Sequence, residues 1–164
     1  MKHSLNLVPS TLNPKSSLRK ILAIDIGAGT QDVLLYDSEL TPENCISLIL
    51  PTPSRNFARL IERCEEDIFI DGDPIGGGAI PSLLKNHIKK GYRVIMSEDA
   101  AYTLRNNLNE VRQYCIRINS SGLNGFKGTK LCLHEIDLAL LKEFLANYEE
   151  DFDIDLVAIA VQDH

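Results

Sequence analysis

The order of the apolar segments constrains the fold more than any other feature of the sequence. Two short apolar runs, Ile21–Ile26 and Val33–Tyr36, flank a turn with two glycines, and a third run follows at Cys45–Leu50. This pattern predicts a hairpin and a third antiparallel strand. After Ser54, helical and strand-like segments alternate, which is typical of parallel strands joined by helices. We therefore expect an α/β fold with a mixed sheet, which starts with three antiparallel strands, continues with parallel strands and carries helices on both faces.

Helix-capping residues and the spacing of apolar residues predict the helices and strands that follow. Ser54 is expected to cap a helix, and Ile68–Ile70 to form a short strand. Pro81 opens a second helix, and Ser97 caps a third. Asp155–Val161 is the most apolar strand of the chain, so we expect it in the core.

Length and charge limit the class of protein. The 164 residues suit one domain with its own core. The formal charge of −6 argues against a general nucleic-acid binder, whose partner calls for a basic face. No apolar run approaches the roughly 20 residues of a membrane span, and Met1–Ser17 has no export signal. We expect a cytoplasmic protein without a membrane partner, in which residues 1–18 are a flexible lead.

The cysteines do not form a metal-binding pattern. The chain has four, and no two lie within four residues of each other. This spacing excludes a zinc knuckle, a redox C-x-x-C pair and a cysteine cluster for an iron–sulfur centre. We expect buried, reduced thiols.

The segment Asp25–Asp32 (Asp-Ile-Gly-Ala-Gly-Thr-Gln-Asp) is the strongest chemical signal. Gly27 and Gly29 are expected to take positive φ and to let backbone N–H groups approach an anion. Thr30 adds a hydroxyl donor, and Asp25 is placed to hold Mg²⁺ through water. The alternative is a plain hairpin, but an unpaired Asp inside an apolar strand costs roughly several kcal/mol.

This segment resembles the phosphate-binding hairpin of the actin-like ATPase superfamily, which includes sugar and acetate kinases, heat-shock chaperones and bacterial filament proteins. The resemblance implies a ribonuclease H-like fold that binds Mg²⁺ and ATP. It also implies that residues 19–164 are the first lobe of a longer protein, with a second lobe of the same chain as partner. The residues that it implies for nucleotide contacts are Gly27, Ala28, Gly29, Thr30 and Gln31, with Asp25 for the metal.

A closer resemblance covers most of residues 20–164. The motif, the Gly76–Gly78 segment and the terminal Ala-Val-Gln-Asp-His are similar to a prokaryotic family whose members carry the label pyruvate formate-lyase activating enzyme. A radical activase needs three clustered cysteines for its iron–sulfur centre, which this chain lacks.

Further polar residues follow the predicted strands, where ligands of open α/β sheets bind. Asp71 or Asp163 could orient a water or accept a hydroxyl proton, as the catalytic residue. Turn chemistry explains Asp71 equally well and Asp73 better. Gly76–Gly78 is either a second anion cradle or a flexible hinge.

Three functions remain open. The first is a nucleotide-binding lobe of an actin-like ATPase or kinase. The second is a ribonuclease H-type nuclease, with two metals held by Asp25, Asp71 and a helix carboxylate such as Glu62. The third is a binding or assembly module that keeps the fold without turnover. A nucleotide requirement that depends on Asp25 would distinguish the first of these.

Overall fold

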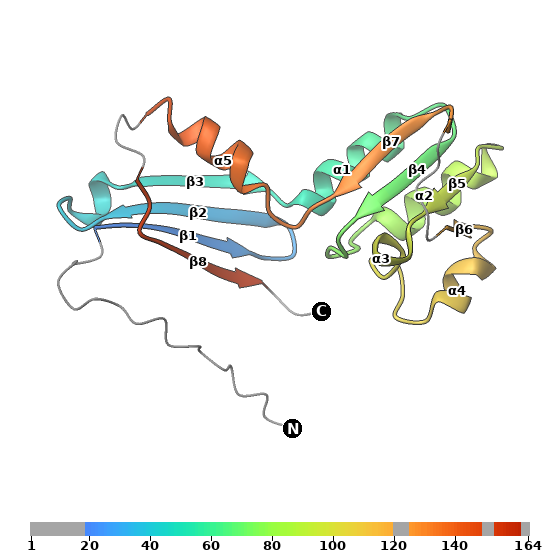
Figure 1. Cartoon of the computed structure of the whole chain (residues 1–164), viewed down its shortest axis with the longest axis horizontal. Helices are drawn as coiled ribbons and strands as arrows, with labels where there is room; N and C mark the ends of the chain where they lie inside the picture. The colour runs from blue at the N-terminus through green and yellow to red at the C-terminus, as the bar shows by residue number, and fades with distance from the viewer. Residues whose placement is uncertain (1–18, 120–124, 149–152, 162–164) are drawn as a thin grey trace, which may run out of the picture.

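The computed structural model describes residues 19–119, 125–148 and 153–161. Strands and helices alternate along much of this length (Figure 1). The strands are β1 (Lys20–Ile26), β2 (Thr30–Asp37), β3 (Ile46–Pro51), β4 (Ile68–Gly72), β5 (Val94–Met96), β6 (Arg117–Ile118), β7 (Thr129–Leu133) and β8 (Leu156–Val161). The helices are α1 (Pro53–Arg63), α2 (Ile80–Lys89), α3 (Glu98–Ala101), α4 (Leu108–Gln113) and α5 (Leu138–Leu145), with a 3₁₀ turn at Pro42–Asn44.

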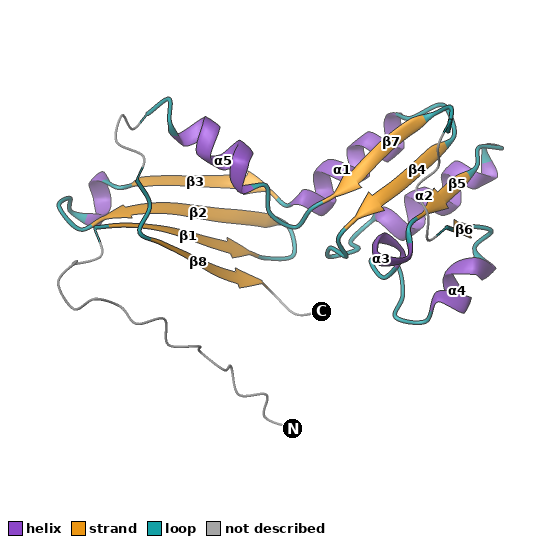
Figure 2. Ribbon diagram, viewed as in Figure 1, coloured by secondary structure: helices purple, strands orange, loops and turns teal. Residues whose placement is uncertain are grey.

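The strands form two separate sheets, which lie side by side in Figure 2. One is mixed and has the order β3-β2-β1-β8, and the other is parallel throughout and has the order β6-β5-β4-β7. The predicted mixed α/β class is confirmed, but the expectation of a single sheet was wrong. Apolar periodicity identifies a strand without identifying the strand that it pairs with.

The mixed sheet begins with the predicted hairpin. β1 and β2 pair antiparallel along their length, and β3 pairs antiparallel with β2. β8 then pairs parallel with β1. The buried positions of β1 alternate along the strand, and Leu22, Ile24 and Ile26 pack with Leu141 and Leu145 of α5. This face of the mixed sheet is therefore its core face, and α5 covers it.

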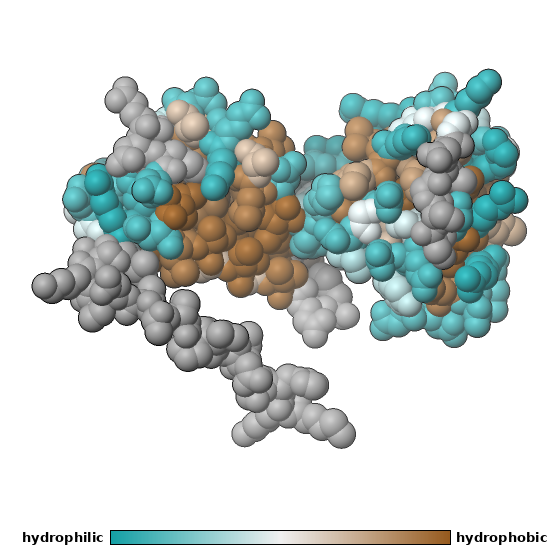
Figure 3. Space-filling view, in the orientation of Figure 1, coloured by the Kyte–Doolittle hydropathy of each residue, from teal (hydrophilic) through white to brown (hydrophobic). Residues whose placement is uncertain are grey.

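The last strand differs from its prediction. β8 is an edge strand in which every residue is exposed, including Ile159 at 49% and Val161 at 54%. The expectation of a core strand was wrong because β8 has a strand neighbour only on the β1 side. Figure 3 shows the resulting apolar surface, in brown, over the mixed sheet.

One carboxylate fixes the segment before β8 to the start of β1. Asp155 Oδ2 accepts hydrogen bonds from the backbone N–H of Arg19 at 2.7 Å and of Lys20 at 2.8 Å. The bond from Lys20, followed by that from Arg19, holds the pKa of Asp155 below its usual 3.8. A carboxylate with a lowered pKa in the folded state stabilises the protein above its unfolded pKa. That stabilisation is lost as the pH falls through the folded pKa.

We therefore expect the free energy of unfolding of the wild-type protein to exceed that of Asp155→Asn at neutral pH. The difference should narrow as the pH falls below about 4, the ordinary pKa of an Asp. Urea denaturation at a series of pH values measures both proteins. A difference that stays constant down to the lowest pH would contradict this role for the carboxylate.

The parallel sheet has its own core. Its central strands β4 and β5 pack with helices α1 and α2 around Ile68, Met96, Ile80 and Leu84, each of which is almost fully buried. The predicted helix after β3 begins one residue before Ser54, and its N-cap is Thr52 rather than Ser54 because Pro53 takes the first helical position. Among the helices of the described residues, none is long and apolar enough to cross a membrane.

Candidate functional site

The hairpin between β1 and β2 forms as the motif predicts. Ile26 is the register partner of Gln31, and the backbone N–H of Gly27 donates to the carbonyl oxygen of Thr30 at 2.9 Å. The turn therefore consists of Gly27, Ala28, Gly29 and Thr30. It lies where β1 ends, at the carboxyl end of the two parallel strands β1 and β8.

The two turn glycines act differently from the expectation. Neither is among the glycines with positive φ, so the prediction of left-handed backbone at Gly27 and Gly29 was wrong. A Cβ at Gly29 would meet no atom within 4 Å, and one at Gly27 would lie 3.5 Å from the carbonyl oxygen of Thr30. The fold therefore does not require these glycines. Their effect is to leave the backbone of the turn uncovered, which a bound anion would use.

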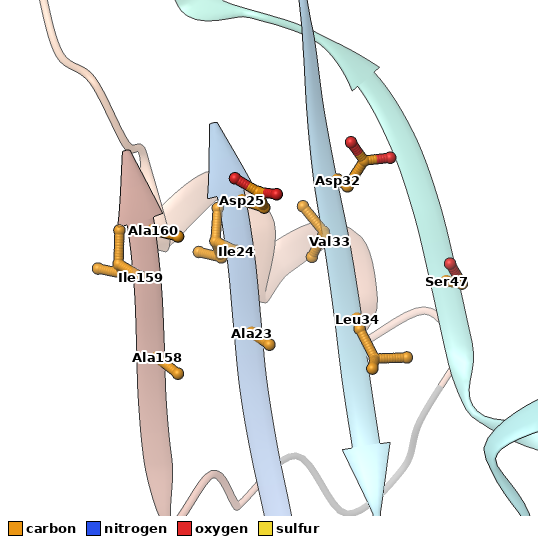
Figure 4. A pocket seen from close by; sticks show the side chains of 10 residues that line it. All are labelled: Ala23, Ile24, Asp25, Asp32, Val33, Leu34, Ser47, Ala158, Ile159 and Ala160. Carbon is orange, nitrogen blue, oxygen red and sulfur yellow. The ribbon is translucent and has the colours of Figure 1, made fainter. Parts of the chain in front are cut away.

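Two carboxylates face each other beside this turn. Asp25 of β1 is the direct cross-strand partner of Asp32 of β2, and both are exposed. Both side chains lie on the face turned away from α5, which we call the open face (Figure 4). Thr30 precedes Asp32 by two residues, so it belongs to the same face. Like charges directly opposite each other in a sheet repel, so this pair favours a cation between or above the two groups.

The open face offers a small donor set for a cation, the two carboxylates of Asp25 and Asp32. Within the described residues, no group of three or more His, Cys, Asp or Glu side chains could hold a metal ion. Zinc and calcium sites built by protein alone need more ligands than a carboxylate pair. Mg²⁺ commonly takes one or two carboxylates and completes its shell with waters and substrate phosphates. Asp25 and Asp32 therefore fit Mg²⁺ bound together with a phosphate.

Gln31 is separated from the rest of the motif. Its side chain is on the opposite face from Thr30 and Asp32, where it is 6% exposed. It lines a hollow of about 480 Å³ between the end of β3 and helices α1 and α5. A phosphate at the turn would therefore meet Thr30, whereas the Gln31 side chain lies behind the sheet.

The start of α1 fixes the hairpin turn. The carbonyl oxygen of Gly29 accepts from the backbone N–H of Thr52 at 3.5 Å and from the Arg55 guanidinium at 3.4 Å. Arg55 is thus a cationic side chain beside the turn, a group that suits phosphate binding. Sequence reasoning missed it, because only the folding of α1 against the hairpin brings Arg55 there.

The predicted catalytic carboxylates lie elsewhere or outside the described part. Asp71 is in the parallel sheet as the register partner of Cys132, and its Oδ1 accepts from the backbone N–H of Gly72 at 2.9 Å. Asp71 lines neither the open face around Asp25 and Asp32 nor the hollow at the tip of the hairpin turn. Asp163 is outside the described residues. Partial desolvation of the exposed Cys132 thiol, followed by the negative charges of Asp71 and Asp73, raises its pKa, so this cysteine is poorly suited to act as a nucleophile.

A second hollow opens at the tip of the turn, with a volume of about 450 Å³. Its walls come from the hairpin, from the start of α1 and from the loop that precedes α2. They bring Gly76 and Gly78 of the glycine-rich segment close to Gly27 and Ala28. Glu135 supplies the carboxylate of this hollow, and no sequence pattern pointed to it. The structure thus joins two segments that the sequence analysis had considered separately.

The chain was compared with known proteins in three ways. No curated protein and no solved structure matches it. Residues 75–164, more than half of the 164-residue chain, match the model of a protein family described as "Putative pyruvate format-lyase activating enzyme (DUF1786)". The chain belongs to this family.

Proposed function

We propose that the protein binds Mg²⁺ and the phosphate groups of ATP at the β1–β2 hairpin, as a lobe of an actin-like ATPase or kinase. The observation that carries this proposal is the pairing of Asp25 with Asp32 on the open face, beside an uncovered turn. Phosphoryl transfer needs mainly positioning and charge neutralisation. A metal between two carboxylates, a hydroxyl from Thr30 and a guanidinium from Arg55 would supply both.

The arrangement of the mixed sheet supports a ribonuclease H-like lobe. Three antiparallel strands are followed by a parallel strand on the far side of β1, and the proposed site lies where β1 ends. In such a lobe, a second lobe of a longer chain would close over the nucleotide. We propose this second lobe as the partner on the same observation that supports the nucleotide, the carboxylate pair beside the turn.

The activity in the family's description is not the one we propose. A radical activase holds an iron–sulfur centre with clustered cysteines. In the described structure Cys45 and Cys64 are buried, whereas Cys115 and Cys132 are exposed, and no three of them form a group that could hold a metal. The carboxylate pair supports phosphate chemistry instead.

A ribonuclease H-type nuclease has less support. It needs further carboxylates around the same metals. Asp71 belongs to the other sheet, and Glu62 is an exposed residue of α1. Neither forms a metal-binding group with Asp25 in the described part of the chain.

Calorimetric titration with Mg²⁺-ATP and Mg²⁺-ADP tests the proposal. We expect binding that weakens about tenfold in Thr30→Ala, as the loss of one hydrogen bond to a charged group predicts. Glu143→Gln, which removes an exposed carboxylate on α5, is the control and should bind as the wild type does. If no nucleotide binds and a nucleic acid is cleaved with Mg²⁺, the nuclease alternative replaces the proposal. Absence of both leaves the assembly module.

Gly29 gives an independent test. A Cβ at this position meets nothing in the protein, and its φ is not positive, so Gly29→Ala should unfold at the same urea concentration as the wild type. The added methyl group would instead occupy the space that a phosphate needs above the turn. We expect weaker Mg²⁺-ATP binding with unchanged stability. Loss of stability, or full binding, would count against an uncovered turn as the anion site.

A further inference from the structure

The hollow at the tip of the hairpin turn brings a glycine-rich backbone segment, two hydroxyl groups and one carboxylate together. Its volume of about 450 Å³ would hold a phosphate with part of a small molecule. Glu135 is the one ionisable side chain among the described residues that line it. The lining residues are Ile26, Gly27, Ala28, Thr52, Ser54, Pro74, Ile75, Gly76, Gly78, Glu135 and Val161.

The glycine-rich wall of the hollow is fixed by packing. The backbone N–H of Ile75 donates to Thr103 Oγ1 at 3.1 Å. A Cβ at Gly77 would lie 2.7 Å from the carbonyl oxygen of Thr103, so the segment passes too close to that residue for any side chain. Gly78 has a φ of +48°. These contacts hold the segment in one path, which argues for an anion cradle and against a flexible hinge.

A carboxylate already uses this cradle. The backbone N–H of Gly76 donates to Oε2 of Glu135 at 3.1 Å, across 59 positions of sequence. A backbone N–H that binds a carboxylate has the position and polarity to bind a phosphate oxygen. Glu135 thus occupies the place that the oxygen of an incoming anion would take.

Two hydroxyl groups complete the hollow. Thr52 Oγ1 and Ser54 Oγ lie 3.1 Å apart, and Thr52 is 2% exposed. The Thr52 side chain does not cap α1, although Thr52 is its N-cap residue. One hydroxyl proton suffices for the bond between the two groups, so the second proton is available to a ligand.

We propose that this hollow is a second oxyanion site, in which Glu135 holds the Gly76 N–H in the free protein and releases it to a phosphate or carboxylate group of a ligand. This second site extends the proposed function. It depends on that function only for the identity of the molecule that supplies the anion. The source is either the terminal phosphate of the nucleotide or an anionic second substrate. Glu135 would act as a resident anion that sets the affinity for either one.

The test is an NMR titration of the protein with inorganic phosphate at constant ionic strength, with the Gly76 amide as the reporter. We expect Glu135→Gln to bind phosphate about tenfold more tightly than the wild type, because a charged competitor is removed. Ser54→Ala should bind it more weakly. Glu110→Gln is the matched control, since Glu110 pairs with Arg105 at 3.8 Å and does not line the hollow.

Equal phosphate affinity in Glu135→Gln and the wild type would overturn the proposal, as would phosphate shifts that leave Gly76 unchanged. A second titration with a non-hydrolysable Mg²⁺-ATP analogue present identifies the source, because the analogue carries the terminal phosphate. Exclusion of inorganic phosphate by the analogue assigns the hollow to the nucleotide's terminal phosphate, and simultaneous binding assigns it to a second substrate. If the analogue does not bind at all, the proposed function fails while the phosphate result still decides this one.

Discussion

Gly72→Ala is expected to destabilise the protein by about 3 kcal/mol or more, because strain and collision add at this position. Gly72 ends β4 with a φ of +102°, a backbone conformation that side chains rarely adopt. A Cβ there would lie 2.6 Å from the backbone nitrogen of Leu133 and closer still to its carbonyl oxygen. Leu133 is the register partner of Gly72 in β7, so the collision would separate the two strands where they end.

Gly91 offers a matched control for this prediction. Its φ of +97° is almost the same, but a Cβ there would meet nothing within 4 Å. Gly91→Ala should therefore lose only the strain contribution, about 1 kcal/mol. Urea denaturation of the two variants separates strain from collision. Equal losses of stability would show that the β4–β7 contact does not constrain Gly72.

Asp25→Asn is expected to change stability and binding in opposite directions. In the free protein, Asp25 and Asp32 are like charges in direct cross-strand register. Neutralising one of them should raise the free energy of unfolding by about 0.2–1 kcal/mol. The same change should weaken Mg²⁺-nucleotide binding by about 10–100-fold, as is typical when a residue that orders the shell of a metal is lost.

Asp32→Asn should show the same combination, since the two carboxylates have equivalent positions in the pair. Thermal unfolding without ligand and calorimetry with Mg²⁺-ADP measure the two effects. A fall in stability in both variants would mean that the carboxylates have structural partners in the folded protein. The site would then have no need of a cation.

Local sequence patterns predicted the hairpin well, because its glycine turn and the two apolar runs that flank it lie within a few residues of each other. Asp25 and Thr30 were predicted for the site, and the register places them on one face with Asp32, to which the sequence had given no role. The turn glycines were predicted for the wrong reason, since the backbone there is not left-handed.

Contacts between distant segments were out of reach of the sequence. Arg55 reaches Gly29 and Glu135 reaches Gly76 only because α1 and the loop before α5 fold back to the hairpin and to the glycine-rich segment. The exposure of β8 was missed for the same reason, since an apolar run does not reveal how many elements cover the strand. Thus strands and local turns were predictable, whereas the second sheet and the hollow required the tertiary structure.

The most direct test of a Mg²⁺-dependent nucleotide site is the dissociation constant of ADP measured with Mg²⁺ and again with a chelator. In the wild type, we predict that Mg²⁺ tightens ADP binding, because the metal joins the phosphates to Asp25 and Asp32. In Asp25→Asn, that tightening should largely disappear. ADP binding that is equally strong with and without Mg²⁺, or a Mg²⁺ effect that survives in Asp25→Asn, would contradict the assignment of the metal to this carboxylate pair.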